Sequence, residues 1–177
     1  MAEEVLEQLS EELEEDTQKG KFMTFKSGNE FFGVELKYIV EIIGIQPITA
    51  VPEVEDYIKG LINLRGKIIP VIDVRIRFKQ EPHEYNDRTC IIIINVSGTI
   101  VGLIVETIAG VVNIDESNIE PPPSISSENG KNKYVYGLGK VDDKVKLLLD
   151  PHKLIKYEDL TLVMDEEDAG EEQEVKE

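Results

Sequence analysis

An internal repeat is the feature of this sequence that most restricts its fold. Residues 27 to 45, "SGNEFFGVELKYIVEIIGI", share a layout with residues 97 to 114, "SGTIVGLIVETIAGVVNI": a small turn, a short strand, a glycine and then an apolar stripe. Residues 57 to 73, "YIKGLINLRGKIIPVID", likewise match residues 134 to 150, "YVYGLGKVDDKVKLLLD". The chain is therefore expected to fold as two similar lobes.

The repeat predicts an all-β-dominated fold with short helices. Each copy should contain a strand, a turn, a second strand, a short helix or helical turn, a loop and a closing hairpin, which are enough strands to roll a small barrel. The hairpins should turn at residues 63–66 and 140–144. The expected helices carry apolar side chains at helical spacing, namely Leu36, Ile39, Val40 and Ile43 in one copy and Val105, Ile108, Ala109 and Val112 in the other.

Composition limits the partners and the compartment. The chain has 177 residues and a formal net charge of -17, from 36 acidic and 19 basic residues, so nucleic acid and anionic membranes are poor partners. No apolar stretch is long enough to cross a membrane, and the acidic start lacks the basic region of a signal peptide. We expect a cytoplasmic protein without direct membrane insertion. The single cysteine, Cys90, fits a reducing compartment and is expected to be a buried structural residue.

Much of the acidic charge lies at the two ends. The N-terminal tail, residues 1–19, has Val5, Leu6, Leu9 and Leu13 at helical spacing, so it either forms an amphipathic helix on a partner or stays solvated. The C-terminal tail, residues 158–177, has no apolar periodicity and is expected to be disordered. The core domain should occupy residues 20–157.

A search for catalytic, metal and cofactor motifs predicts none of these sites. His83 and His152 have no partner at metal-ligand spacing, and the chain lacks a phosphate-binding glycine loop and a nucleophile elbow. Asp142 and Asp143 occupy a turn in which solvated aspartate is common. The chain is therefore not expected to be an enzyme or to need a cofactor.

Arg65, at the tip of the "NLRG" turn, raises the question of function. Arginine does not favour tight turns, and the second copy has the ordinary turn acids Asp142 and Asp143 in the matching hairpin. Tyr38, Ile42 and Val111 lie off the apolar stripes. Apolar surface beside an arginine is typical of a protein interface, although the same residues would also fit helices that are buried on more than one side.

Together these features resemble the CheW family of chemotaxis coupling proteins. The resemblance covers about residues 20–157 and is most specific in "IKGLINLRGKIIPVIDVR", with support from "VELKYIVEII" and "VGLIVETIAGVV". It implies two intertwined five-stranded SH3-like β-barrel lobes, at about residues 22–80 and 88–155 with strands partly exchanged. It also implies an adaptor of two-component signal transduction. Such a scaffold joins methyl-accepting chemoreceptors to the regulatory domain of the histidine kinase CheA, in arrays at the inner face of the membrane.

The resemblance also implies a receptor-binding surface. In the family, the tip of the receptor lies in an apolar groove between the lobes, near the arginine of the NLRG turn. Carried over to this sequence, Arg65 is the polar anchor and Asn63 and Gly66 shape its turn. The candidate groove or contact residues are Ile39, Glu41, Ile42, Gly102 and Val111.

Two other functions remain open at this stage. A small enzyme could use Arg65 to hold an anionic substrate between the lobes, but it would need a base or nucleophile beside the arginine. A generic SH3-like peptide-binding module would be expected to have an aromatic groove, and this chain has no tryptophan. The relatives CheV and CheA carry additional domains, for which too few residues follow position 157.

Overall fold

The computed structural model describes residues 18–122 and 133–161. This part of the chain consists of strands joined by tight turns and short helical turns. The first half contains β1 (Lys21–Ser27), β2 (Glu30–Glu35), the 3-10 turn η1 (Leu36–Tyr38), β3 (Ile39–Gly44), β4 (Ile58–Leu64), β5 (Lys67–Asp73) and α2 (Val74–Arg77). The second half contains β6 (Cys90–Val96), β7 (Thr99–Val105), β8 (Thr107–Asn113), η2 (Glu116–Asn118), β9 (Ile119–Glu120), β10 (Val135–Val141), β11 (Lys144–Leu149) and α3 (Pro151–Leu154).

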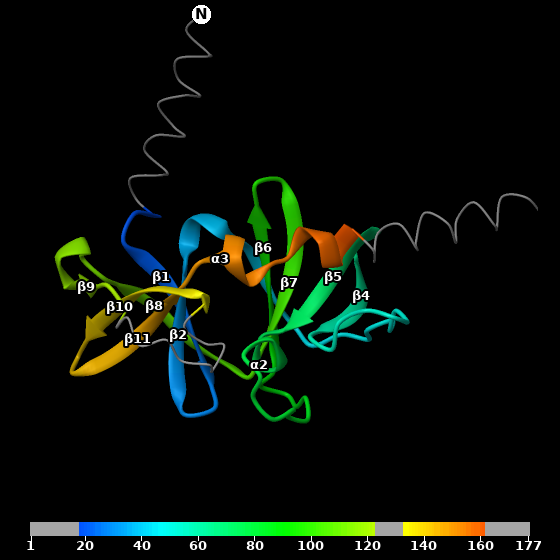
Figure 1. The fold of residues 1–177 in the computed structure, drawn as a ribbon, viewed down its shortest axis with the longest axis horizontal. Coiled ribbons are helices and arrows are strands. Elements are labelled where there is room, and N and C mark those ends of the chain that lie inside the picture. Colours follow the sequence, from blue (N-terminus) through cyan, green and yellow to red (C-terminus); the bar gives the residue numbers. More distant parts are fainter. Residues whose placement is uncertain (1–17, 123–132, 162–177) are drawn as a thin grey trace, which may run out of the picture.

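The strands form two sheets, which confirms the all-β class and the two-lobe architecture. One sheet has the order β8-β1-β2-β11-β10-β9, and the other has the order β3-β6-β7-β5-β4. In Figure 1 the two groups lie side by side, with β1, β2, β10 and β11 in one group and β4 to β7 in the other. The two-residue strand β9 at a sheet edge adds to the five strands expected in that lobe.

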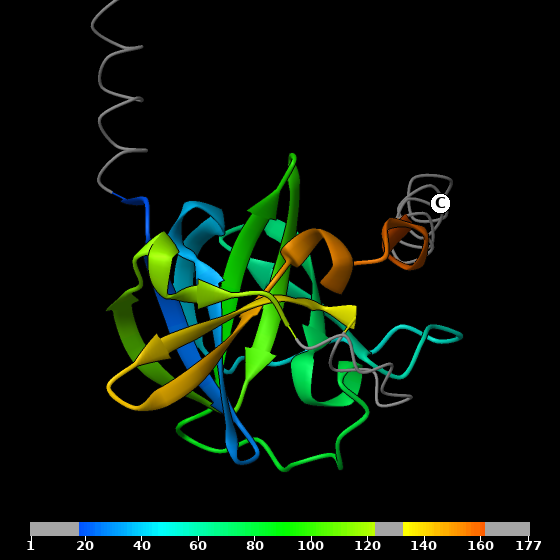
Figure 2. The ribbon, with the colours of Figure 1, turned by 60° about the vertical axis from the view of Figure 1, so that its left-hand side comes forward.

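The two lobes do not correspond to the two halves of the sequence. The "split lobe" combines residues 21–35 with residues 107–149, and the "central lobe" is the continuous stretch 39–105. Figure 2 shows the result, with the blue β1–β2 hairpin beside the yellow and orange β10 and β11. The expected lobes were about residues 22–80 and 88–155 with strands partly exchanged. In the structure the exchange extends to a whole hairpin, because each lobe takes one from the other half of the sequence.

Short connections between strands explain this exchange. Only Glu106 separates β7 from β8, whereas a hairpin needs at least two loop residues. Strand β8 therefore cannot turn back beside β7, and it passes into the other sheet, where it pairs with β1. In the first half the three residues of η1 make the same transfer, and β3 pairs with β6.

The apolar stripes belong to strands, so the expected helices at residues 36–43 and 105–112 were wrong. Only Leu36–Tyr38 is helical, as a single 3-10 turn. Burial alternates along β3 and along most of β8, as it does when one face of a strand packs on a core. Both segments are rich in β-branched residues, which favour strands, and their spacing fits either period over so few residues.

The sequence repeat is a structural repeat at the level of strand register. Ile42 pairs with Ile92 in the central lobe, and Val111 pairs with Met23 at the matching place in the split lobe. The closing hairpins also match, because the amide of Asp73 donates to the carbonyl of Tyr57 just as the amide of Asp150 donates to that of Tyr134. The two lobes are thus related by the repeat, and residues at its matching positions are structurally equivalent.

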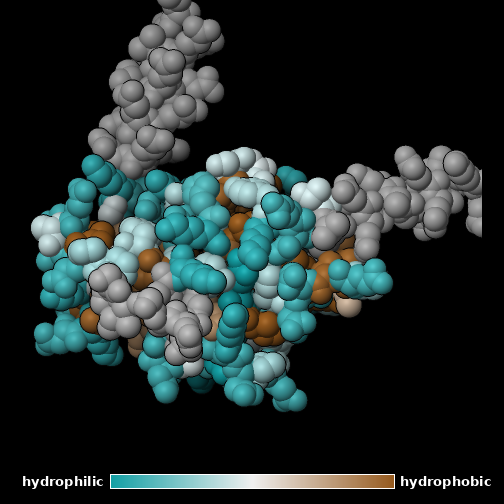
Figure 3. Space-filling view, viewed as in Figure 1, coloured by the Kyte–Doolittle hydropathy of each residue, from teal (hydrophilic) through white to brown (hydrophobic). Residues whose placement is uncertain are grey.

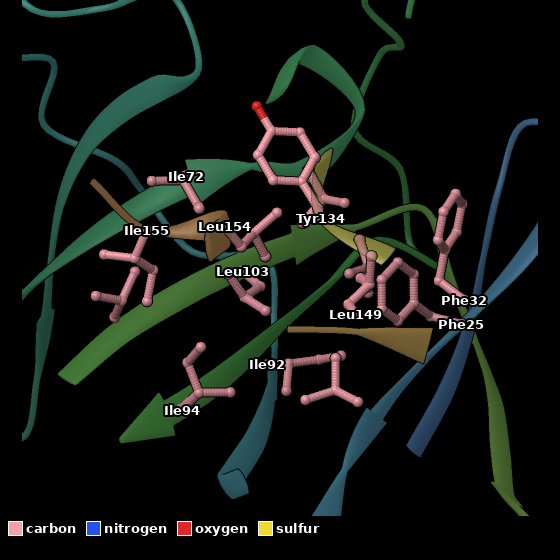
Figure 4. Close-up of a cluster of buried hydrophobic side chains, with 14 of the residues drawn as sticks. Phe25, Phe32, Ile72, Ile92, Ile94, Leu103, Tyr134, Leu149, Leu154 and Ile155 are labelled. Atoms are coloured by element: carbon pink, nitrogen blue, oxygen red, sulfur yellow. The ribbon is translucent and has the colours of Figure 1, made fainter. Parts of the chain in front are cut away.

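The largest core cluster draws on both lobes. Figure 4 shows Phe25 and Phe32 of the split lobe and Ile92 and Leu103 of the central lobe around a common centre with Leu149. All five side chains are fully buried, whereas most of the described surface in Figure 3 is hydrophilic. Each buried side chain of this size contributes about 1.5–3 kcal/mol of hydrophobic stabilisation. A shared core of this kind makes the two lobes one folding unit.

Three smaller expectations have definite outcomes. The hairpins turn where predicted, with Leu64 paired to Lys67 and Val141 paired to Lys144. Cys90 is only partly buried, at the margin of the core. The folded part of the chain continues past residue 157 into a helical turn at residues 157–161, where Leu160 is buried in the core.

The expectations for the acidic tails concern residues that the structure largely does not describe. The N-terminal helix through Val5, Leu6, Leu9 and Leu13 lies outside the described residues. The expected C-terminal disorder lies outside them for residues 162–177.

Candidate functional site

The "NLRG" segment forms a two-residue turn between β4 and β5. Arg65 and Gly66 have φ values of 52° and 86°, the left-handed conformations of a type I′ hairpin turn. The side-chain oxygen of Asn63 accepts a hydrogen bond from the Gly66 amide at 2.8 Å. Asn63 and Gly66 therefore shape the turn, as expected, whereas Arg65 occupies a left-handed position that costs an arginine about 1 kcal/mol.

The same turn occurs without an arginine elsewhere in the protein. Between β6 and β7, Asn95 accepts from the amide of Gly98 at 2.9 Å, and Ser97 has a φ of 52° in the place that Arg65 takes. In the split lobe Asp142 fills this place, with a φ of 48°. Three different side chains thus occupy equivalent turns, so the hairpin does not require the guanidinium.

The guanidinium of Arg65 pairs with the carboxylate of Glu41 on β3. The arginine side chain is 71% exposed and that of Glu41 is 28% exposed. An ion pair this open to water contributes about 0.2–1 kcal/mol to folding, so its main effect is to hold the guanidinium over β3. By the sequence repeat, Gly110 and Asp142 occupy the matching positions of the split lobe. The charge pair is therefore particular to the central lobe.

Exposed apolar side chains precede and follow Glu41 along β3 and lie on the opposite face of that strand. Val40 is 54% exposed and Ile42 is 37% exposed, whereas Ile39 points inward and packs against the main core. Val111 is 51% exposed but lies on β8, at the edge of the other sheet. The structure thus groups Arg65, Glu41 and Ile42 on one lobe and places Val111 at the symmetry-related position on the other.

Gly102 does not lie on the surface, which corrects its assignment as a contact residue. It is buried in β7, between β5 and β6. A Cβ at this position would lie 2.7 Å from methyl groups of both Ile91 and Val71. Gly102 is glycine because two strands and their side chains meet over it, and its role is packing.

A buried arginine at the junction of the lobes was not anticipated from the sequence. The guanidinium carbon of Arg77 lies 4.2 Å from the ring centre of Tyr57 and 4.8 Å from that of Tyr134. Its Nε donates to the carbonyl of Leu154 at 2.9 Å. The two tyrosines are symmetry-related in the repeat, and their recurrence in the sequence was the available signal.

The ionisable groups of the described residues have structural roles rather than catalytic ones. Asp73 and Asp150 cap the short helices α2 and α3 by accepting backbone amide hydrogen bonds. Burial, followed by the hydrogen bond to Asp73, raises the pKa of Tyr85 well above its ordinary value. Burial likewise lowers the pKa of Lys146, which lies over the ring of Phe31.

Neither metal ligation nor membrane crossing is indicated by the described part of the chain. Residues 18–122 and 133–161 contain no cluster of three or more histidine, cysteine, aspartate or glutamate side chains that could hold a metal ion. The helices in these ranges are all too short to span a bilayer.

Comparison with known proteins identifies the relatives of this chain. A family model described as the CheW-like domain matches residues 21–159. The chain is similar to the chemotaxis protein CheW of Klebsiella aerogenes, with 33% identity over 143 residues, which cover 81% of this chain and 86% of that protein. It is also similar to chemotaxis protein CheW of Helicobacter pylori, with 29% identity over 136 residues, 77% of this chain and 81% of the relative.

A solved structure has the same fold. The scaffolding protein TtCheW from Thermoanaerobacter tengcongensis aligns with a TM-score of 0.72 and 36% sequence identity. The alignment covers 77% of this chain and 92% of the TtCheW chain.

Proposed function

Because this chain belongs to the CheW-like family, we propose that it links transmembrane chemoreceptors to the histidine kinase CheA. It is a chemotaxis scaffold, or coupling, protein and not an enzyme. The proposal adds the two partners and their binding surfaces. It also places the protein in the cytoplasm, recruited to receptor–kinase arrays at the inner face of the membrane.

The observation that supports the receptor-binding site is the presence of Arg65 in a turn that does not require an arginine. The turn would accept glycine or aspartate at less cost, so holding an arginine at its tip points to a binding role. Glu41 holds the guanidinium over β3, and Val40 and Ile42 of the same strand expose apolar side chains on its opposite face. A charged group and exposed apolar surface on one strand suit a helical partner whose turn carries polar groups.

We propose that Arg65 anchors the receptor when its guanidinium leaves Glu41 and binds polar groups of the receptor tip. A receptor hairpin tip presents backbone carbonyls and polar side chains, and a guanidinium has five donors with which to bind them. The stem of the arginine can pack on apolar neighbours at the same time. Because the pair with Glu41 is open to water, little free energy is needed to redirect the guanidinium.

The kinase is proposed to bind a barrel end. CheA's regulatory domain has the same kind of lobes in this family, so an apolar end of one protein can meet its counterpart in a pseudo-symmetric contact. On the split lobe, Val145 is 48% exposed next to the closing turn of β10 and β11, and it provides apolar surface of the required kind. Such a contact should depend only weakly on salt.

The test is Arg65→Glu, with Lys140→Glu as the matched control. Both substitutions reverse one exposed charge, and Lys140 lies on the closing hairpin of the other lobe. Arg65→Glu should weaken binding to a receptor cytoplasmic fragment by about 1.5–3 kcal/mol, the range for lost hydrogen bonds to a charged group. Its unfolding free energy should change by only about 0.5 kcal/mol.

Binding to the CheA regulatory domain should be unchanged in Arg65→Glu. Lys140 pairs with Val145 at the proposed kinase surface, so Lys140→Glu should weaken kinase binding instead and leave receptor binding intact. Isothermal calorimetry with each partner separately measures these effects. Equal losses for receptor and kinase, or an unfolded central lobe, would contradict the proposed role of Arg65.

A further inference from the structure

A cleft at the junction of the two lobes gathers positive charge on a strongly acidic chain. Four exposed lysines line it, and the buried Arg77 lies at its base between the rings of Tyr57 and Tyr134. The lysines are Lys79, Lys133, Lys153 and Lys156. This cleft shares no residue with the surface around Arg65, so it is a separate site.

The fold brings these cations together from distant parts of the sequence. Lys79 follows α2 of the central lobe, and Lys156 follows α3, at the matching position of the repeat. Lys153 lies within α3, and Lys133 precedes β10. Two lysines at equivalent positions of the repeat, Lys79 and Lys156, therefore converge on one cleft.

Little in the described structure neutralises this charge. Within residues 18–122 and 133–161, none of the four lysines forms an ion pair with a carboxylate. Glu55 and Asp56 also line the cleft, but they are outnumbered by the cations. A cleft in which cations outnumber carboxylates favours an anionic occupant.

We propose that the occupant is the chain's own acidic C-terminal segment, residues 165–177. This segment, "DEEDAGEEQEVKE", has eight acidic residues and one lysine, so its charge is complementary to that of the cleft. The chain passes Lys156 and then the helical turn 157–161 before it leaves the described residues. The segment therefore begins close to the site that it complements.

The helical turn at residues 157–161, where the described chain ends, is anchored at the cleft. Tyr57, which lines the cleft, donates its hydroxyl hydrogen bond to the carboxylate of Asp159, and Leu160 is buried in the core. Asp165 lies four residue steps beyond Thr161, a span of at most about 14 Å for extended chain. Tethering at this distance gives a local concentration of about millimolar, so any free acidic ligand has to displace the segment.

Paramagnetic relaxation enhancement in the full chain tests the proposal. A nitroxide is attached at Glu171→Cys in a Cys90→Ala background, and the amide signals of Tyr134, Leu154 and Gln80 are followed. At about 25 mM salt these signals should lose more than half of their intensity, and they should recover at about 500 mM, where the Debye length is only a few Å.

Two quadruple variants with the same net charge separate a specific site from general attraction. The cleft variant carries Lys79→Gln, Lys133→Gln, Lys153→Gln and Lys156→Gln, and the control carries Lys37→Gln, Lys67→Gln, Lys140→Gln and Lys144→Gln. Broadening should disappear in the cleft variant and persist in the control. Equal loss in both variants, or undiminished cleft signals in the wild-type sequence, overturns the proposal. The second result overturns it even if a free polyglutamate peptide shifts the same amides, because the cleft would then serve an acidic partner instead.

Discussion

Two symmetry-related glycines allow a matched test of packing at the junction between strands. Gly102 of β7 lies opposite Val71, and Gly33 of β2 lies opposite Leu148 at the equivalent point of the other lobe. A Cβ on Gly102 would lie 2.7 Å from methyl groups of Val71 and Ile91, whereas a Cβ on Gly33 would lie 3.1 Å from one methyl group of Leu148. The same substitution should therefore have different costs in the two lobes.

The magnitude follows from these distances. Contacts of 2.7 Å on two sides require both neighbours of Gly102→Ala to move, so the overpacking cost lies in the upper part of its usual range, at about 2–3 kcal/mol. Val71 and Ile91 are fully buried and branched at Cβ, so they have few alternative rotamers. Replacing glycine by alanine recovers about 0.4–1 kcal/mol through the unfolded state. We expect a net loss of about 1–2.5 kcal/mol for Gly102→Ala and of less than about 0.5 kcal/mol for Gly33→Ala.

Urea denaturation followed by circular dichroism measures both variants against the wild type. A Gly102→Ala protein as stable as the wild type, or a larger loss for Gly33→Ala, would refute the packing argument. The experiment also separates packing from contact. If Gly102→Ala remained fully folded and stable but lost receptor binding, its assignment as a contact residue would be restored.

Two further predictions concern hydrogen-bonded polar side chains. Arg77→Leu should lower the unfolding free energy by about 2–4 kcal/mol, because it removes the contact with two rings and leaves the carbonyl of Leu154 without its donor. The exposed control Arg88→Leu should change it by about 0.5 kcal/mol or less. Equal losses for the two variants in urea denaturation would contradict this prediction. Burial and the hydrogen bond to Asp73 raise the pKa of Tyr85 above its ordinary 10.0. Above pH 10 the unfolded state therefore loses a proton that the folded state keeps. The contribution of Tyr85 to the stability of the folded state is complete below pH 10 and declines above it. Tyr85→Phe should therefore lower the melting temperature at pH 8 and lower it less at pH 11, and an equal difference at both values would contradict the assignment.

The sequence anticipated much of the candidate site because that site is local. Asn63, Arg65 and Gly66 lie within one hairpin, and the second copy of the hairpin provided the comparison that made Arg65 unusual. The ion pair joins Arg65 to Glu41, which lies 24 residues away on β3, and no local sequence pattern predicts it. The resemblance assigned Gly102 to the contact surface, but Gly102 is buried. Whether a strand residue is buried depends on the segments that pack over it, which the local sequence does not show.

The helical expectation for residues 36–43 failed for a related reason. Four apolar residues over eight positions fit both a helix and a strand with one buried and one exposed face. The structure gives the strand because β3 has a partner, β6, that is nearly 50 residues away. Val40 and Ile42 were thus placed in the wrong element, although the exposure of Ile42 agrees with its position off the stripe.

By itself, the sequence determined the existence of two similar strand-rich lobes, the positions of their closing turns and the family to which the chain belongs, since turn chemistry and repeated apolar patterns are local properties. Only the tertiary structure decided which strands share a sheet. Lobes built from consecutive strands and lobes that exchange hairpins both satisfy the same repeat, and the choice depends on the one-residue connection at Glu106. The tertiary structure also placed Arg77 between two tyrosines and gathered four lysines in one cleft. Such contacts join residues from opposite halves of the chain, and their energies arise only when the strands have been exchanged and the lobes have closed on one core.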